Sequence, residues 1–412
     1  MTQATTGNEN PSCHRQCAPD FGPAATGQGH RVARRAEEMT SFIVMDVLER
    51  ACELECQGVD VVHLEVGEPD FDAPACVTEA ATRAMAEGFT HYTHSLGILP
   101  LREAISDYYR ETYRVAVDPD RIVVTAGCSP AIFMTCAVLL EAGDEVILPD
   151  PYYACYPNFI QFVQGRCVTV PVMEADGFQY TPEAIQSRMT SRSRAIFINS
   201  PSNPTGTLLS AERMQAIAGL GPLIISDEIY HGLVYEGRAH SILEFTDRAF
   251  VINGFSKLFA MTGLRLGYVI APKPFMRGLQ KIHQNFFISA NAAVQKAGIA
   301  ALSGAHADVA RMKATYDQRR RFMIERLRRI GFTISVEPTG AFYIFVNARH
   351  LSDDSYALAF DILEKAHVGV TPGIDFGPNG EGYLRFSYAN SLENIREGLD
   401  RLERYVRQHH RT

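Results

Sequence analysis

The chain has 412 residues, of which 46% are hydrophobic, and its formal net charge is −8 at pH 7. This length can bury a full core and favours two domains. The acidic balance argues against nucleic acid as a principal partner, because phosphate-backbone binding needs clustered Lys and Arg. No stretch approaches the ~20 apolar residues of a membrane-spanning helix. Residues 1–10 lack the apolar segment of a secretory signal, so we expect no membrane partner and a cytoplasmic location.

The nine cysteines are spread without framework spacing, which is typical of reduced thiols in a cytosolic protein. Cys13 and Cys17 are four residues apart, but no second pair of ligands accompanies them, so no metal site is expected.

The first predicted elements are an extension, a helix and a short strand. Residues 1–38 are rich in Thr, Gly, Asn and Pro, which predicts a flexible extension. Apolar spacing predicts an amphipathic helix over 41–57 with Ser41 as its N-cap. A short strand over 61–66 then leads to Gly67.

From about residue 90, short apolar runs alternate with helical patterns, which predicts an α/β domain with a largely parallel sheet. The predicted strands are 122–125, 146–148, 167–170, 195–198, 223–226, 250–253 and 267–270. A basic helix over 311–329 then leads to a shorter α+β segment. Its predicted strands are 333–336, 342–345 and 383–386.

The most informative motif is Ser256-Lys257 followed by Arg265, directly after the apolar run 249–252. An amine nucleophile must lose its proton, and a desolvated pocket or a nearby cation promotes that loss. Arg265 can supply the cation and also bind an anion through two parallel hydrogen bonds. The motif therefore predicts a Schiff-base lysine beside a phosphate site.

Three further motifs supply complementary chemistry. Asn203 lies in the turn Pro201-Ser202-Asn203-Pro204, Asp227 ends an apolar run and is followed by Tyr230, and Arg385 is isolated in an apolar strand. A carboxylate keeps a pyridine nitrogen protonated, amide and phenol groups donate to a phenolic oxygen, and arginine binds carboxylates.

Together these motifs resemble the class I/II aminotransferases of fold type I, which use pyridoxal 5′-phosphate (PLP), from about Glu65 to Arg385. The resemblance implies a large PLP-binding domain over 89–305, with a mostly parallel mixed sheet between helices. It also implies a smaller α+β domain made of 39–88 and 306–412, preceded by the extension 1–38.

The resemblance assigns roles around the cofactor. Lys257 forms the Schiff base and carries the proton, Asp227 pairs with the ring nitrogen, and Tyr153 stacks on the ring. Asn203 and Tyr230 donate to the phenolic oxygen. The phosphate contacts are Cys128, Ser129, Ser256 and Arg265.

The resemblance also assigns the substrate site and the assembly. Arg385 binds the substrate α-carboxylate, helped by Gly67 and Asn203. Tyr92 reaches the phosphate of a neighbouring subunit, which implies a homodimer with shared sites. The same family often places cis peptides at Asp150-Pro151 and Asn203-Pro204.

The implied activity is a transaminase reaction, in which an amino group moves from an L-amino acid to a 2-oxo acid by a ping-pong mechanism through the Lys257 aldimine. A PLP-dependent carbon–sulfur β-lyase is the alternative on the same fold, because the same lysine serves both reactions. A transcription regulator would need a basic helix-turn-helix module, for which the extension 1–38 is too short and too polar.

The donor is expected to have a neutral side chain. His283 aligns with the position where some relatives carry an arginine for an acidic side chain, and a neutral imidazole is a poor substitute for a guanidinium. Phe42, Ile43 and Phe287 are predicted to line an apolar pocket instead.

Overall fold

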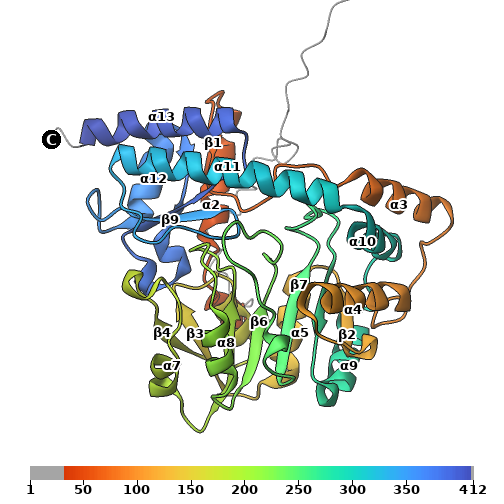
Figure 1. Cartoon of the computed structure of the whole chain (residues 1–412). Coiled ribbons are helices and arrows are strands. Elements are labelled where there is room, and N and C mark those ends of the chain that lie inside the picture. The colour runs from red at the N-terminus through yellow and green to blue at the C-terminus, as the bar shows by residue number, and fades with distance from the viewer. Residues whose placement is uncertain (1–31, 410–412) are drawn as a thin grey trace, which may run out of the picture.

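The computed structural model describes residues 32–409, and its largest element is a seven-stranded sheet (Figure 1). The strand order is β2-β8-β7-β6-β5-β3-β4, and β8 alone runs antiparallel to its neighbours. The strands are β2 (Ile122–Thr125), β3 (Glu145–Asp150), β4 (Arg166–Pro171), β5 (Ser193–Asn199), β6 (Leu223–Asp227), β7 (Ala249–Gly254) and β8 (Gly267–Ile270).

All seven strands predicted between residues 122 and 270 are therefore confirmed, and they form one mixed, mostly parallel sheet. The sequence pattern is clear because strands such as β2, β7 and β8 are buried on both faces, so they are continuous apolar runs.

Helices cover both faces of the sheet, and alternate strand residues point to opposite sides. Ile225 and Phe197 pack in the cluster that includes α5, α6 and α9. Ile224 and Ile196 pack in the cluster on the other face, which includes α4, α7, α8 and α10. These helices are α4 (Leu99–Tyr113), α5 (Cys128–Leu139), α6 (Tyr156–Phe162), α7 (Pro182–Arg188), α8 (Ala211–Ala218), α9 (Met276–Phe286) and α10 (Ala292–Gly304).

Two small sheets form the second part of the molecule. One is antiparallel with the order β11-β12-β9, and the other pairs β1 with β10 in parallel. Their strands are β1 (Val62–His63), β9 (Tyr343–Asn347), β10 (Val368–Gly369), β11 (Thr371–Pro372) and β12 (Tyr383–Ser387). The helices beside them are α2 (Ile43–Cys56), α12 (Ser355–Ala366) and α13 (Leu392–His409).

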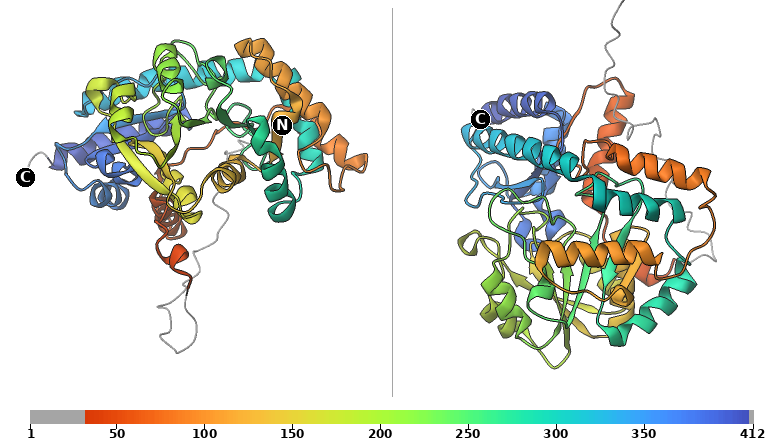
Figure 2. Two further views of the ribbon diagram at one scale, coloured as in Figure 1. Left: turned by 90° about the horizontal axis from the view of Figure 1, so that it is seen from below. Right: turned by 45° about the vertical axis from the view of Figure 1, so that its right-hand side comes forward.

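The long helix α11 (His306–Ile330) connects the two parts, running from beside α13 to the end of α10 (Figures 1 and 2). An ion pair of 2.6 Å between Arg326 and Asp400 ties α11 to α13. The basic helix predicted over 311–329 is thus confirmed, and it extends slightly further at its start.

The helix α3 (Ala75–Ala86) packs on α10, beside the large sheet, although the predicted boundary at residue 88 groups it with the small domain (Figure 1). Within the predicted extension 1–38, the described part contains the exposed helix α1 (Arg34–Glu37). Cys13 and Cys17 lie outside the described residues. Within 32–409, no helix combines the length and the apolar character needed to span a bilayer.

Two local predictions were wrong. Ser41 does not cap α2, since its hydroxyl donates to Asp46 at 2.7 Å; the Asp375 carboxylate instead accepts from the backbone N–H groups of Ile43 and Val44, at 3.0 and 3.3 Å. A distant carboxylate therefore replaces the local cap.

The predicted strand 333–336 is reduced to one bridge, between Thr333 and Asn347. The Ile334 carbonyl accepts a hydrogen bond from the Arg328 guanidinium at 3.0 Å. Both predicted cis peptides, Asp150-Pro151 and Asn203-Pro204, are present, and Ser200-Pro201 is also cis.

Candidate active site

The carboxyl ends of the central parallel strands open into a pocket of about 340 Å³. Open α/β sheets bind ligands at this edge, because the strand ends and the loops after them converge there. Asn199 ends β5, Asp227 ends β6, and Lys257 follows the end of β7. The three-stranded antiparallel sheet closes the pocket from the other side, with Tyr343 of β9 and Arg385 of β12.

Every residue predicted to contact the cofactor or the substrate α-carboxylate, except Tyr92, lies in the lining of this one pocket. The predicted residues found there are Gly67, Cys128, Ser129, Tyr153, Asn203, Asp227, Tyr230, Ser256, Lys257, Arg265 and Arg385. Tyr92 is 81% exposed and lies outside the pocket of its own chain.

The Lys257 amine lies at the centre of this lining. Its Nζ donates a hydrogen bond of 2.6 Å to the Gly67 carbonyl and lies 5.9 Å from the centre of the Phe342 ring. Burial lowers the Lys257 pKa to about 8, and the guanidinium groups of Arg385 and Arg265 act in the same direction. The amine thus loses its proton far more readily than a solvated lysine would.

Asp227 provides a buried negative charge. Its Oδ2 accepts from the Tyr156 hydroxyl at 2.7 Å, and its Oδ1 accepts from the Ile229 backbone N–H at 3.1 Å. Burial raises the Asp227 pKa to about 6, while these two hydrogen bonds and the charge of Lys257 oppose the rise. The side chain is therefore mostly a carboxylate at neutral pH, suited to a cationic nitrogen.

The start of α5 and the Arg265 guanidinium lie close together at one end of the pocket. Gly127 precedes the helix with φ +91°, and a Cβ there would lie 2.5 Å from Nη2 of Arg265. A Cβ on Gly267 would lie 2.9 Å from the backbone nitrogen of Cys128. The two glycines let the guanidinium and the strand approach the helix N-terminus, where N–H groups favour anions.

Ser129 and Ser256 add hydroxyl groups to the lining at this end. Cys128 is the first residue of α5. Burial raises the pKa of its thiol well above the usual value, so it is a neutral thiol in this pocket.

Arg385 is almost fully buried, with 2% of its surface exposed. Its Nη1 donates to Asn203 Oδ1 at 2.9 Å, and its Nη2 donates to the Glu65 carbonyl at 2.5 Å and to Thr371 Oγ1 at 3.1 Å. The guanidinium also lies 4.3 Å from the centre of the Tyr343 ring. Its Nε has no partner, so a buried donor remains for a carboxylate.

Several lining residues were not predicted from sequence, and some of them contact predicted ones. The Tyr343 hydroxyl lies 2.8 Å from that of Tyr230, and Tyr156 bonds to Asp227. Tyr343 could have been found from strand pairing, because Phe345 is opposite Arg385 and Tyr343 shares the face of Phe345. The remaining unpredicted lining residues include Glu68, Asn199 and Thr262.

The expectation for an apolar side of the pocket was only partly right. Phe42 lines the pocket and makes an edge-to-face contact with Tyr153, with ring centres 5.9 Å apart. Ile43 and Phe287 are not in the lining, where Val44 and Met45 stand instead. His283 is also outside the pocket lining. Its side chain is buried on α9, where the ring contacts the Ser95 carbonyl. Helix α2 supplies the apolar side because its first turn reaches over the pocket.

The pocket suits PLP on three structural grounds. The N-terminus of α5 with Arg265 matches a phosphate, the buried Asp227 matches a protonated ring nitrogen, and Lys257 offers an amine of lowered pKa. These groups line one continuous cavity.

Comparison with known proteins agrees with this chemistry. Residues 59–402 match the family model described as aminotransferase class I and II. The chain is 40% identical over 379 residues to a (5-formylfuran-3-yl)methyl phosphate transaminase of Methanocaldococcus jannaschii, covering 91% of this chain and 99% of the relative. It is 38% identical to an aspartate aminotransferase of Pyrococcus horikoshii, covering 90% and 96% of the two chains.

The solved structure of Thermus thermophilus aspartate aminotransferase with maleate superposes with a TM-score of 0.88 at 37% identity, covering 91% of this chain and all of that one. The relatives are transaminases, and none of these comparisons favours the β-lyase alternative. The chain therefore belongs to the class I and II aminotransferases and is a PLP-dependent transaminase of fold type I.

Proposed function

We propose that Lys257 is the residue to which PLP binds covalently and the base that moves the substrate proton. The observation that carries this proposal is the buried Nζ with its lowered pKa, in one pocket with Asp227 and Arg385. When bound, PLP supplies a carbonyl carbon for the amine and a ring that withdraws electrons. The free amine of Lys257 would be the base that accepts the proton from the substrate α-carbon and, as an ammonium, the acid that gives it back to the carbon derived from the PLP carbonyl.

The remaining polar residues orient and bind. Asp227 keeps a positive charge on the ring nitrogen, which makes the ring a better electron sink. Asn203 donates through Nδ2 to the phenolic oxygen, since its Oδ1 already accepts from Arg385. The Tyr230 hydroxyl is the second donor, and Tyr153 lies against the ring.

The two ends of the pocket take the two anions. Cys128 and Ser129 at the start of α5, with Ser256 and Arg265, hold the phosphate. Arg385 holds the substrate α-carboxylate, using donors that include the unpartnered Nε. Gly67 is close by, because a Cβ there would lie 2.0 Å from the Tyr343 hydroxyl, which itself packs beside Arg385.

We further propose an amino donor with a neutral side chain. The described lining contains three cationic side chains, and each has a role above: Lys257, Arg265 and Arg385. The apolar side chains of Phe42, Val44 and Met45 stand in the same lining. Aspartate, the donor in the names of several relatives, is the competing candidate.

A homodimer in the cytoplasm completes the proposal. Tyr92, Leu99, Phe286 and Ile288 expose 81%, 47%, 69% and 46% of their surfaces. The backbone N–H of Thr93 donates to Ser289 Oγ at 3.4 Å, so the segments containing Tyr92 and Ile288 are adjacent. Exposed apolar groups of this kind mark interfaces. The free thiols of Cys136 and Cys167 suit a reducing compartment.

Two experiments test the proposal. Borohydride reduction of the PLP-loaded protein, followed by peptide mapping, should place the cofactor on the peptide containing Lys257. Cofactor on another lysine would refute the assignment. A panel of donors with 2-oxoglutarate and pyruvate as acceptors should give the highest kcat/KM for a neutral amino acid, and a maximum for aspartate would refute the proposed donor.

A further inference from the structure

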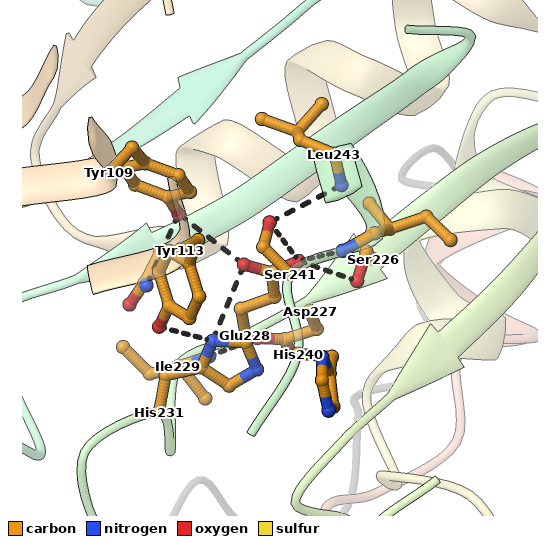
Figure 3. A network of polar contacts seen from close by, with 12 residues as sticks. Tyr109, Tyr113, Ser226, Asp227, Glu228, Ile229, His231, His240, Ser241 and Leu243 are labelled. Atoms are coloured by element: carbon orange, nitrogen blue, oxygen red, sulfur yellow. Dashed lines mark hydrogen bonds and ion pairs between the residues drawn. The ribbon is translucent and has the colours of Figure 1, made fainter. Parts of the chain in front are cut away.

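The residue after Asp227 carries a second buried carboxyl group, which lies outside the pocket. Glu228 is 1% exposed and does not contribute to the pocket lining. Its Oε1 accepts three hydrogen bonds, from Ser226 Oγ at 3.1 Å, Ser241 Oγ at 3.0 Å and the Ile242 backbone N–H at 3.0 Å (Figure 3). This carboxyl therefore ties the end of β6 to the short helix η4 (Ile242–Glu244).

The other oxygen of Glu228 faces helix α4. The Tyr109 hydroxyl donates to Oε2 at 3.4 Å, and Nδ1 of His231 lies 3.4 Å from the same oxygen. The Tyr113 hydroxyl lies 2.8 Å from that Nδ1 (Figure 3). Three segments distant in sequence thus meet at one buried side chain.

The connection continues to the strand that leads to Lys257. Nδ2 of Asn253 donates to the Tyr109 hydroxyl at 3.5 Å, and Oδ1 of Asn253 accepts from the backbone N–H of Gly254 at 2.7 Å. Asn253 and Gly254 end β7, directly before the turn that contains Lys257. The Tyr109 hydroxyl is therefore shared between the ends of β6 and β7.

The network carries little charge at neutral pH. Burial raises the Glu228 pKa to about 8, although its hydrogen bonds oppose the rise. Burial also lowers the His231 pKa to about 3. A neutral acid beside a neutral imidazole places no second anion next to Asp227. A glutamine keeps this neutral charge and an accepting oxygen at the Oε1 position, and its amide nitrogen donates where the acid hydroxyl stood.

We propose that Glu228 is a positioning residue that sets the placement of Asp227 relative to Lys257 through Tyr109 and Asn253. The inference rests on the roles proposed above for Asp227 and Lys257. Glu228 makes no contact with the pocket, so its effect passes through the strand ends. Reacting groups displaced by about 1 Å can lose about 10²-fold in rate, so an anchor this close to both strand ends has kinetic consequences.

The test compares Glu228→Gln with Glu228→Leu. The glutamine variant should keep kcat, the affinity of the apoprotein for PLP, and the pH midpoint of the visible absorption of bound PLP. The leucine variant should lower kcat by about 10²-fold, weaken PLP binding and shift the midpoint, with a small change in KM. Wild-type values of kcat, PLP affinity and midpoint in a folded leucine variant would overturn the proposal.

Two more variants make the outcome specific. Glu145→Leu is the matched control, because Glu145 is also a buried glutamate of the large sheet, bonded to Thr190 away from the pocket. Glu145→Leu should lower Tm without shifting the pH midpoint of the absorption of bound PLP. A shift equal to that of Glu228→Leu would overturn the proposal. If Glu228→Leu does not fold, Tyr109→Phe keeps the Glu228 carboxyl but removes the hydroxyl that joins it to Asn253. It should shift the midpoint in the same direction, and an unchanged midpoint would overturn the proposal.

Failure of this inference differs from failure of the proposed function. If Lys257→Ala retains full turnover, the proposed function is wrong. If Lys257→Ala is inactive while Glu228→Leu matches the wild type, only the positioning role is wrong.

Discussion

The hydroxyl oxygens of Tyr230 and Tyr343 lie 2.8 Å apart and connect the two parts of the molecule across the pocket. Tyr230 follows β6 of the large sheet, whereas Tyr343 is the first residue of β9 in the three-stranded antiparallel sheet. One hydroxyl donates to the other, so the position of Tyr230 depends on the small sheet. A donor proposed to act on the cofactor is therefore oriented by a residue that also packs against Arg385.

Replacing Tyr343 by phenylalanine should lower kcat by about two- to tenfold, because one hydrogen bond is worth about 0.5–1.5 kcal/mol net. The visible absorption spectrum of bound PLP should shift as well, since Tyr230 loses its fixed orientation. Tyr356→Phe on the exposed side of α12 is the control. Equal behaviour of the two variants would contradict the proposed role of the pair.

The buried amine predicts a pH-dependent stability of the apoprotein. The Lys257 pKa falls from 10.5 in the unfolded chain to about 8 in the folded one. Between these pH values the unfolded state binds the extra proton, so the free energy of unfolding rises with pH. Compared with Lys257→Met, the wild type should gain about 3 kcal/mol from pH 8 to 10.5, at about 1.4 kcal/mol per pKa unit.

Urea unfolding of both apoproteins across this range measures the difference. A difference that stays constant with pH would show that the folded and unfolded amines titrate alike. Lys281→Met is the matched control, because Lys281 is exposed on α9 and lies outside the pocket.

Arg385→Lys keeps a positive charge but removes the paired donors. We expect kcat/KM for amino acids to fall by about ten- to a hundredfold, because a hydrogen bond to a charged group is worth about 1.5–3 kcal/mol. The loss should appear mainly in KM, while the affinity for PLP changes little. Arg326→Lys in the α11–α13 ion pair is the control. An unaltered KM would mean that another group holds the α-carboxylate.

Shared active sites can be tested by complementation. Lys257→Ala and Tyr92→Ala homodimers should each be nearly inactive. A mixed dimer contains one site with Lys257 and Tyr92 both intact, if each site takes Tyr92 from the partner. Mixing the two variants after mild dissociation should therefore restore activity. If activity does not return in a mixture that sedimentation shows to be mixed dimer, Tyr92 acts within its own chain or not at all.

The Asp375 cap predicts a local effect on the pocket. Asp375→Ala leaves two N–H groups of α2 without their partner and should cost about 0.5–2 kcal/mol of stability. Since α2 carries Val44 and Met45 in the pocket lining, KM should also rise. Burial raises the Asp375 pKa from 3.8 to about 6, so the folded chain binds the proton more tightly than the unfolded one. The wild type should therefore gain stability relative to the variant as the pH falls through this window. Asp353→Ala, at an exposed position, should change neither quantity.

The large sheet could be predicted from its local apolar runs, whereas most residues of the pocket were assigned through the resemblance of their motifs to a known family. Asp227 ends an apolar strand, and Asn203 and Lys257 lie within a few residues of the ends of two others. The carboxyl ends of parallel strands meet at one edge of a sheet, which brings these residues together. Arg385 was recognisable as an isolated cation in an apolar strand. Recognising these residues does not require knowing which distant segments of the chain pair with one another.

What sequence could not provide depends on pairing between distant segments. Tyr343 enters the pocket through the register of β9 on β12, and Asp375 caps a helix more than 300 positions earlier in the chain. Ser41 has the chemistry of an N-cap, but the Asp46 carboxylate binds its hydroxyl instead. His283 was assigned to the pocket by alignment alone, although α9 directs its ring towards the Ser95 carbonyl.

The carbonyl oxygens of Glu65 and Gly67 accept from Arg385 and Lys257, respectively, which are the two cations proposed to hold substrate and cofactor. Both acceptors belong to the peptide backbone, so no side-chain substitution deletes them. Scanning mutagenesis would overlook their contribution at both positions. Replacing the following amide with an ester by chemical synthesis weakens each acceptor while all side chains are retained. Residues 65 and 67 thus contribute to the pocket through their main-chain carbonyl groups and not through their side chains.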